Sequence, residues 1–374
     1  MQLVLTPDKF KGSLTAAEVC QIVKRGVKRY DPAVRVRSIP LADGGEGTLD
    51  ILIPLLRLEI VRTTVPDPLF RPIPACYGMQ GDTAYVEMAV ASGLPLLKEA
   101  ERDPLRTTSL GTGELLRHAI ERGARRVYLF VGGSATNDAG LGLAQALGYR
   151  FLDVQGQELS PVGGNLIRVA RIEKEQLLPQ LADVEIRVVS DVNNPLYGSQ
   201  GAAQVYAPQK GATAAAVHLL EQGLTNMADR MQDFSGNDVR NVPGAGAAGG
   251  IGAGAVAFLG AQLIPGIATM LDLCQAPPAI AQADLVVSGE GKIDAQTLHG
   301  KVVKGVGDVC RQHGVPLNVI CGTLEASPAE LKQLNVQRAY AVKEGSMTLA
   351  EALANTEARV EALAYRMIAD FYAS

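Results

Sequence analysis

Short apolar runs alternate along the chain with polar segments rich in glycine. In the run 127–131 every side chain is aliphatic or aromatic, as in a buried strand. The polar stretch 132–138 ends in helix-capping residue types and leads into residues 139–147, so we expect a strand, a loop and a helix start. At the carboxyl edge of an open α/β sheet such a junction favours an anion, and phosphate is the expected ligand. The alternative is an ordinary tight turn with a good N-cap.

The same order of elements recurs along the chain. Residues 2–6 predict a short strand, and the loop 7–13 leaves it. Thr15 and Glu18 have the spacing of a capping box at the start of a helix whose apolar residues follow the 3.6-residue period. Seven strands are expected, each releasing a loop rich in glycine and carboxylate: 2–6, 34–39, 83–88, 127–131, 184–189, 284–288 and 317–321.

Length and composition shifts indicate how the chain is divided. At 374 residues the chain exceeds what one core usually organises, so two domains are expected. Four prolines between residues 66 and 74 predict an extended segment that crosses to the second domain. The uncharged stretch 242–271 is long enough to span a membrane, but its glycines and prolines favour a buried helix entered through a glycine-rich loop. Residues 348–372 have the pattern of one regular amphipathic helix.

The charge balance argues against nucleic acid as a partner. Lys and Arg total 35, Asp and Glu total 39, and the formal net charge is −4, without a long basic run. A small polar ligand fits better, and we expect no membrane partner. The five cysteines are scattered without a Cys-x-x-Cys pair, which suits reduced thiols in the cytoplasm. We expect no zinc site and, with a first strand at residue 2, no signal peptide.

Carboxylates and lysines in the loops carry the candidate chemistry. A single loop carboxylate usually caps a turn. Five at the same sheet edge, as expected here, could hold Mg²⁺ through water and accept a proton from a hydroxyl group. Lysines could balance phosphate charge, although each alone is more often a solvated surface residue. Anion cradle, metal and base are what phosphoryl transfer needs. The carboxylates are Asp43, Glu46, Asp191, Glu290 and Asp294, and the lysines are Lys11, Lys210, Lys292 and Lys301.

Two other classes of protein remain open at this point. A strict P-loop is absent, but residues 244–249 match the Gly-x-Gly-x-x-Gly fingerprint of dinucleotide-binding proteins, with Asp272 a little over 20 residues beyond, so an NAD-dependent hydroxy-acid dehydrogenase is an alternative. It would need a catalytic histidine in a polar loop. The second alternative is a non-enzymatic sugar-acid-binding sensor, which needs a ligand cleft but neither base nor metal. Helical or cationic surroundings of the histidines count against the dehydrogenase: His118, His218, His299 and His313.

Several long, ordered motifs together resemble one family. They are Pro7-Asp8 with 10–13, 42–48, 132–138, Ser190-Asp191 with 194–196, 208–211, 243–250, and 289–291 with Asp294 and Gln296-Thr297. In these motifs the chain resembles the bacterial glycerate kinase family, of the type unrelated to the MOFRL-domain glycerate kinases. The resemblance runs from the first strand to about Lys301. Lys9 stands where such sequences often have Ser, Lys292 where Arg is common, and 66–79 is poorer in glycine than usual.

The resemblance implies an ATP-dependent kinase that acts on D-glycerate with Mg²⁺. It also implies a two-domain α/β fold, in which a Rossmann-like parallel-sheet domain formed by both chain ends encloses an inserted α/β domain. We expect residues 1–66 and 283–374 in the first domain, residues 67–282 in the second, and the active site in the cleft between them. The expected product is phosphoglycerate, with 2-phosphoglycerate favoured over 3-phosphoglycerate.

Position and chemistry suggest a role for each candidate residue. Asp191 is the first choice for the base that orients and deprotonates the attacking hydroxyl, Asp43 is the second, and Lys11 with backbone N–H groups of 43–47 would bind the glycerate carboxylate. Expected substrate contacts are Asp8, Lys11, Ser13, Gly44, Gly45, Glu46 and Asn194. Expected ATP contacts are Gly132, Gly133, Ser134, Thr136, Asn137, Asp138, Lys210, Gly289 and Lys301, and expected Mg²⁺ ligands are Glu290 and Asp294.

Overall fold

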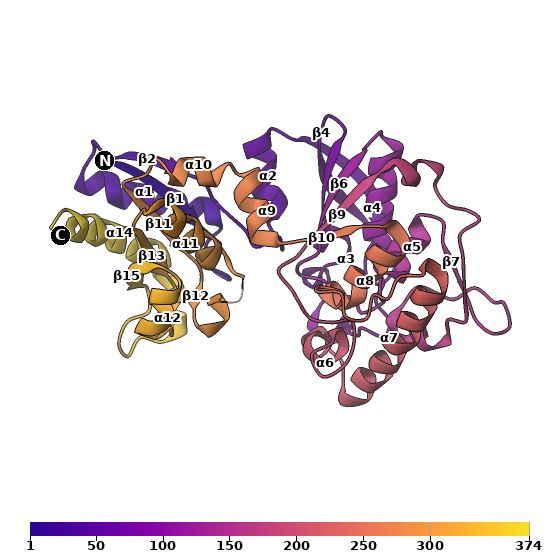
Figure 1. Ribbon diagram of the computed structural model, residues 1–374. Helices are drawn as coiled ribbons and strands as arrows, with labels where there is room; N and C mark the ends of the chain where they lie inside the picture. Colours follow the sequence, from indigo (N-terminus) through magenta and orange to yellow (C-terminus); the bar gives the residue numbers. More distant parts are fainter. Residues whose placement is uncertain (299, 374) are drawn as a thin grey trace. The chain divides into compact units, whose positions relative to one another are not determined.

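The computed structural model describes residues 1–298 and 300–373 and has the expected α/β architecture of parallel strands and covering helices (Figure 1). The chain forms two compact units. Unit 1 consists of residues 1–43 and the chain from residue 266 onward, and unit 2 consists of residues 44–265. His299, one of the histidines weighed above, lies outside the described residues.

The main sheet of unit 1 is parallel throughout and is built from both ends of the chain. Its strand order is β15-β13-β11-β1-β2, so the first strand pairs with one that lies more than 280 residues later. Leu3 and Leu5 on β1 are buried beneath helices on both chain ends. The strands are β1 (Gln2–Pro7), β2 (Arg35–Ser38), β11 (Leu285–Gly289), β13 (Leu317–Cys321) and β15 (Val336–Ala341).

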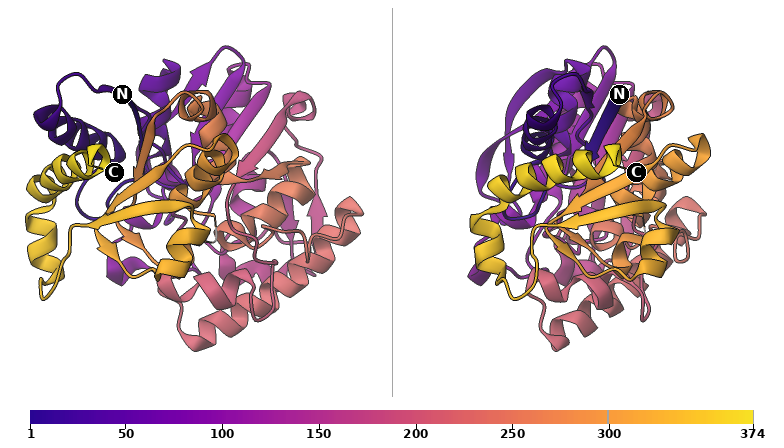
Figure 2. Two further views of the ribbon diagram at one scale, coloured as in Figure 1. Left: turned by 60° about the vertical axis from the view of Figure 1, so that its left-hand side comes forward. Right: turned by 90° about the vertical axis from the view of Figure 1, so that its left-hand side faces the viewer.

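Helix α1 (Ala16–Tyr30) of unit 1 packs against α14 (Thr356–Tyr372), as Figure 2 shows. Gly26 permits the close approach, because a Cβ there would lie 2.3 Å from the carbonyl oxygen of Glu361. The predicted capping box is confirmed: Thr15 Oγ1 accepts the N–H of Glu18 at 3.2 Å. The other elements are α9 (Gly266–Leu273), α10 (Ala276–Ile280), β12 (Lys292–Ile293), α11 (Val302–His313), β14 (Thr323–Leu324), α12 (Pro328–Gln333) and α13 (Leu349–Ala354).

The single helix predicted over 348–372 is wrong, because the structure divides it into α13 and α14. Asn355 lies between them with φ −112° and ψ 12°, outside helical geometry. The apolar period continues across this residue, and a break of one residue leaves such a period almost unchanged.

The main sheet of unit 2 has the order β10-β9-β6-β5-β4-β3. Strands β5, β6, β9 and β10 run parallel, and β3 and β4 are antiparallel additions at one edge. Apolar residues of β6 such as Val127 and Leu129 are fully buried, as their pattern predicted. The strands are β3 (Glu59–Pro66), β4 (Pro72–Gln80), β5 (Thr83–Glu87), β6 (Arg126–Phe130), β9 (Glu185–Val189) and β10 (Gln262–Ile264).

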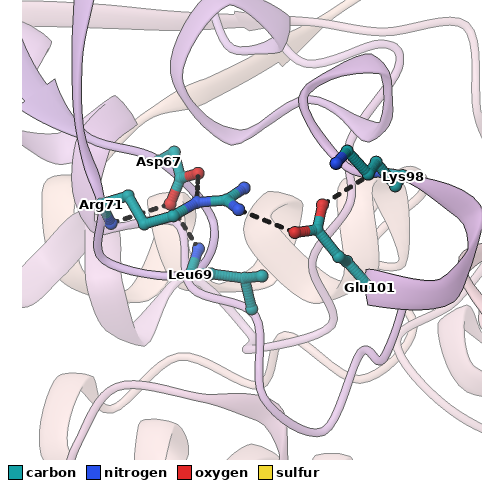
Figure 3. A network of polar contacts seen from close by, with 5 residues as sticks. All are labelled: Asp67, Leu69, Arg71, Lys98 and Glu101. Atoms are coloured by element: carbon teal, nitrogen blue, oxygen red, sulfur yellow. Dashed lines mark hydrogen bonds and ion pairs between the residues drawn. The ribbon is translucent and has the colours of Figure 1, made fainter.

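We predicted that the proline-rich segment crosses to a second domain. Instead it forms the hairpin of β3 and β4. Pro72 and Pro74 lie where β4 has only β3 as a neighbour, since β5 pairs with residues 78–80, and proline is tolerated at such edge positions. Asp67 stabilises the turn through an ion pair with Arg71 and N–H donors of the turn (Figure 3). Residues 44–66 therefore lie in unit 2, and residues 266–282 lie in unit 1, so both boundaries differ from the expected ones.

The stretch 242–271 contains the expected buried helix entered through a glycine-rich loop, but it also contains a strand and a second helix. Within 242–271 the structure forms α8 (Ala247–Leu259), then β10 and α9. No helix in the described part of the chain is both long and apolar enough to cross a bilayer. The remaining elements of unit 2 are α2 (Thr48–Leu56), α3 (Ala89–Ser92), α4 (Leu110–Glu121), α5 (Leu141–Ala146), β7 (Arg150–Leu152), β8 (Arg171–Glu173), α6 (Ala202–Tyr206) and α7 (Ala214–Ser235).

Candidate active site

Three loops of unit 2 start at the carboxyl ends of adjacent parallel strands. In the register, Glu87 at the end of β5 pairs with Phe130 on β6, and Phe130 pairs with Val189 on β9. The loops that follow therefore leave the sheet at one edge, which is where ligands bind in open α/β sheets. One of these loops begins at Gly132, and another contains Asp191.

The loop 44–47 of unit 2 packs directly against the loop that follows β6. A Cβ on Gly132 would lie 2.4 Å from the Cα of Gly45, so the two backbones touch where neither residue has a side chain. A Cβ on Gly133 would lie 3.7 Å from the Cβ of Glu46. The structure thus brings together one segment predicted to bind glycerate and one predicted to bind phosphate.

Only the first part of the loop 132–138 lies near the surface. Gly132 is partly exposed and Gly133 is exposed, whereas Thr136, Asn137 and Asp138 are completely buried. Among the described residues, no hydrogen-bond partner reaches the Thr136 hydroxyl or the Asn137 amide. The contacts that these side chains would make with ATP stay a prediction, and the backbone of 132–133 is the more accessible part of the loop.

Asp138 organises this loop from within the core. Its carboxylate accepts the N–H and the O–H of Ser109, both at 2.7 Å, and the N–H of Gly140 at 3.2 Å. Burial raises the pKa of Asp138, and the Ser109 donors oppose that rise. With these donors committed to Asp138, the side chain fixes the loop between β6 and α5.

Lys210 is also buried, although we expected it to balance phosphate charge. Its Nζ donates to Ser134 Oγ at 2.8 Å and to the Thr136 carbonyl oxygen at 2.6 Å. Loss of hydration lowers the pKa of Lys210 from 10.5 to about 7, against the opposing field of Asp138. Lys210 therefore holds the two ends of the segment 134–136 together and reaches the loop surface only through Ser134.

In Lys210→Met we expect the melting temperature to lose part of its dependence on pH. Because the pKa is lower in the folded state, the unfolded chain binds more protons between pH 7 and 10.5, so stability from this group is complete above 10.5 and is lost as the pH falls through 7. The melting temperature, measured across this pH range, should therefore rise more steeply with pH for the wild type than for Lys210→Met.

The exposed Lys98 of the same unit supplies the control for this prediction. Its backbone N–H, and not its side chain, donates to Glu101 at 2.9 Å (Figure 3). Lys98→Met should keep the wild-type slope. Equal slopes in Lys210→Met and the wild type would contradict a lowered pKa at Lys210.

The segment after β9 contains two predicted site residues. Asp191 is half-buried and immediately follows Ser190, whose N–H donates to the Ile264 carbonyl oxygen at 3.1 Å. The amide of Asn194 is engaged at both ends: it donates to the carbonyl oxygen of Gln200 at 2.7 Å and accepts from the Tyr206 hydroxyl at 2.8 Å. Asn194 thus stabilises its own loop, and a contact with substrate stays a prediction.

In unit 1, two carboxylates follow the adjacent strands β1 and β11. The N–H of Asp8 donates to the carbonyl oxygen of Gly289 at 2.8 Å, which places Asp8 beside the start of the Glu290 loop. Burial, and secondly the charge of Asp43, raise the pKa of Asp8 to about 7. Burial also raises the pKa of Glu290, against the opposing effect of Lys301, whose Nζ lies 3.2 Å from Glu290 Oε2.

Glu290 has the features of a ligand for one metal coordination position. Its Oε1 is buried, and no described residue forms a hydrogen bond with it. Asp294 pairs with Lys292 at 3.2 Å. No group of three or more Asp, Glu, His or Cys residues suited to a metal occurs within 1–298 and 300–373. This donor set fits Mg²⁺, which often takes only one or two carboxylates and otherwise binds water and phosphate oxygens.

We expected the five loop carboxylates to lie at one sheet edge, but the structure divides them between two sheets. Asp43, Glu290 and Asp294 belong to unit 1, whereas Glu46 and Asp191 belong to unit 2. The strands that precede these loops belong to two different sheets, although their sequence patterns are similar. Of the other predicted residues, Asp8, Lys11, Ser13, Gly289 and Lys301 lie in unit 1, and Gly44, Gly45, Gly132, Gly133, Ser134, Thr136, Asn137, Asp138, Asn194 and Lys210 lie in unit 2.

The glycine motif 244–249 lacks the structure of a dinucleotide fingerprint. Turns and not a strand precede it, whereas the fingerprint needs a strand that enters the glycine turn. Its glycines serve close packing instead: a Cβ on Gly246 would lie 2.3 Å from the carbonyl oxygen of Pro195, and one on Gly249 would lie 2.1 Å from that of Thr136. The dehydrogenase alternative is therefore not favoured.

Glu87 was not among the predicted site residues, yet it is buried at the end of β5 and accepts two N–H donors at the start of α2. The available signal was an acidic residue inside the apolar run 83–88, because a carboxylate is rarely buried without partners. Its partners lie 38 and 40 residues earlier and could not be inferred from the pattern.

Comparisons with known proteins match one family along nearly the whole chain. The model of the glycerate kinase family matches residues 3–372. A glycerate kinase from Halalkalibacterium halodurans is 41% identical over 361 residues, covering 96% of this chain and 95% of that protein. A glycerate 2-kinase from Escherichia coli K12 is 42% identical over 354 residues, covering 94% and 93%. The crystal structure of a protein provisionally named glycerate kinase 2, from Salmonella typhimurium LT2, has a TM-score of 0.86 and 40% identity, covering 100% of this chain and 98% of that one.

Proposed function

Since this chain belongs to the glycerate kinase family and is a glycerate kinase, we propose that it transfers the terminal phosphoryl group of ATP to the 2-hydroxyl of D-glycerate. The observation that carries this proposal is the contact between the loops 44–47 and 132–134 in unit 2. Phosphoryl transfer depends mainly on holding acceptor and phosphate side by side, and two glycine loops in contact suit that task. The name of the Escherichia coli relative supports the choice of the 2-hydroxyl.

In our proposal glycerate binds to the loop 44–47. Backbone N–H groups of 44–46 bind its carboxylate, because the N–H of Gly47 already donates to Glu87. The Glu46 carboxylate accepts a hydrogen bond from a hydroxyl group of the substrate. Gly44 and Gly45 are buried while Glu46 is exposed, so the backbone is held and the acidic side chain is accessible. In unit 1, Lys11 and Ser13 are exposed on the loop after β1 and are the proposed further contacts for the substrate.

The phosphates of ATP lie against Gly132–Ser134 in the proposal, where the small residues let an anion approach backbone N–H groups. Lys210 supports this segment through Ser134 Oγ. Glu290, with Asp294, would hold Mg²⁺, which when bound neutralises charge on the transferring phosphoryl group. Asp191, after the neighbouring strand β9, orients the attacking hydroxyl and takes its proton.

The test is ADP release from ATP and Mg²⁺ with and without D-glycerate, with the product detected through enolase in the absence of a mutase. Glycerate-dependent ADP with an enolase signal supports transfer to the 2-hydroxyl. Glycerate-dependent ADP without that signal keeps the kinase and moves the phosphate to the 3-hydroxyl. Absence of ADP from folded protein supplied with metal contradicts the proposal.

A further inference from the structure

Glu87 lies at the end of β5 and binds the start of α2. Its side chain is 3% exposed. Oε1 accepts the N–H of Gly47 at 3.1 Å, and Oε2 accepts the N–H of Leu49 at 3.0 Å. These donors belong to the first turn of the helix, where no carbonyl oxygen of the helix itself can accept them. A carboxylate from a strand 40 residues further along the chain therefore satisfies both.

The N-cap residue of α2 cannot supply this hydrogen bond itself. Helices usually receive it from Ser, Thr, Asp or Asn at the N-cap. Here the N-cap is Gly47, with φ 89° and ψ 4°, a left-handed conformation that glycine adopts without strain. Glu87 replaces the missing cap, and Thr48 Oγ1 closes the loop by donating to the Gly45 carbonyl oxygen at 2.6 Å.

The loop that Glu87 holds is the one that contacts Gly132. With only 2.4 Å between the Cα of Gly45 and a Cβ built on Gly132, the two loops have no room to move toward each other. The contact with Gly132 therefore limits how far the loop can shift, and a change in the backbone of 44–47 would chiefly alter the direction of its N–H groups.

We infer that Glu87 is a positioning residue for glycerate binding, because its carboxylate fixes residues 44–47 in the conformation that receives the substrate carboxylate. The inference rests on the proposed function, which assigns this loop to glycerate. Glu87 acts through the loop backbone and does not touch the substrate.

Glu87→Gln tests the inference with little change in size. Glutamine keeps one acceptor oxygen but turns an NH₂ group toward an N–H donor. We expect KM for D-glycerate to rise about tenfold or more, because two hydrogen bonds to a charged acceptor are weakened or lost. The KM for ATP and kcat should change little. Hydrogen exchange of residues 44–56, measured without substrates, should be faster than in the wild type.

Asp67→Asn is the matched control. Asp67 is 2% exposed and likewise accepts two backbone N–H groups, those of Leu69 at 2.8 Å and Arg71 at 2.9 Å, in the turn between β3 and β4 (Figure 3). Asp67→Asn should lower the stability of the protein and leave the KM for glycerate unchanged. If Glu87→Gln does not fold, Gly47→Ala disturbs the same cap, because a φ of 89° strains any residue with a Cβ, and it should raise the same KM.

The outcomes separate this inference from the proposed function. An active wild type together with an unchanged glycerate KM in Glu87→Gln overturns the inference and leaves the proposed function standing. Equal rises in both KM values, repeated in Asp67→Asn, indicate a general loss of structure and also overturn it. A wild type that does not phosphorylate glycerate overturns the proposed function, and the inference with it.

Discussion

Replacing Asp191 by asparagine is expected to lower kcat for glycerate phosphorylation roughly 10²–10⁴-fold, the usual contribution of a positioned general base. Asp191 follows β9, and the adjacent strand β6 leads into Gly132, so the proposed base and the proposed phosphate loop share one sheet edge. Asparagine preserves the size and much of the hydrogen bonding but cannot take the hydroxyl proton. KM for glycerate should change much less than kcat, because the lost interaction belongs to the transition state.

Two further variants make this prediction specific. Asp233 on α7 is 67% exposed at its side chain and pairs with Arg230 at 3.2 Å, so Asp233→Asn should keep wild-type turnover. Asp43→Asn tests the second candidate for the base. Normal turnover in folded Asp191→Asn, with loss in Asp43→Asn, would assign the base to Asp43; circular dichroism melting curves establish that each variant is folded.

Gly132→Ala is expected to lower kcat/KM about 10²-fold, because it forces the two glycine loops apart. The added Cβ would lie 2.4 Å from the Cα of Gly45, while ordinary contacts begin at 3.4 Å, so the backbones must separate by about 1 Å. A displacement of that size between reacting groups typically costs about two orders of magnitude in rate. Steady-state kinetics with both substrates measure the effect.

Gly78→Ala provides a comparison, because its added Cβ would lie almost as close to the nearest atom as the one in Gly132→Ala. A Cβ on Gly78, within β4, would lie 2.5 Å from Cδ1 of Leu58, the end of a flexible side chain that can rotate away. We expect a modest loss of melting temperature there and nearly normal kcat/KM. Similar activity losses in both variants would show that overpacking of unit 2, and not separation of the loops, lowers the rate of Gly132→Ala.

Local patterns were a good guide wherever a segment's own residues dictate its structure. Residues 127–130 of the predicted run 127–131 lie in β6, because apolar side chains in such a run need burial. Thr15 and Glu18 formed a capping box because both partners lie within one turn. The prolines between 66 and 74 misled us for the opposite reason. Whether such a segment crosses between domains or turns back depends on what pairs with it, and here β3 pairs with β4.

The candidate site shows the same limit. The loops could be found from glycine and polar residues after apolar runs, but their burial could not. Thr136 and Asn137 look like ligand contacts in the sequence, yet the start of α8, more than 100 residues later, packs against them. Lys210 resembles a surface lysine, yet its Nζ binds within the core.

Local patterns were enough for the α/β class, for seven of the eleven strands in the two main sheets and for the glycerate kinase motifs, because hydrophobic period, helix caps and glycine turns act over a few residues. Which strand ends are neighbours became known only from the three-dimensional fold. That fold divided the five carboxylates between two sheets, joined Gly45 to Gly132, and gave Gly47 a cap from Glu87. These contacts depend on strand pairing and register between segments distant in sequence, which no local pattern specifies.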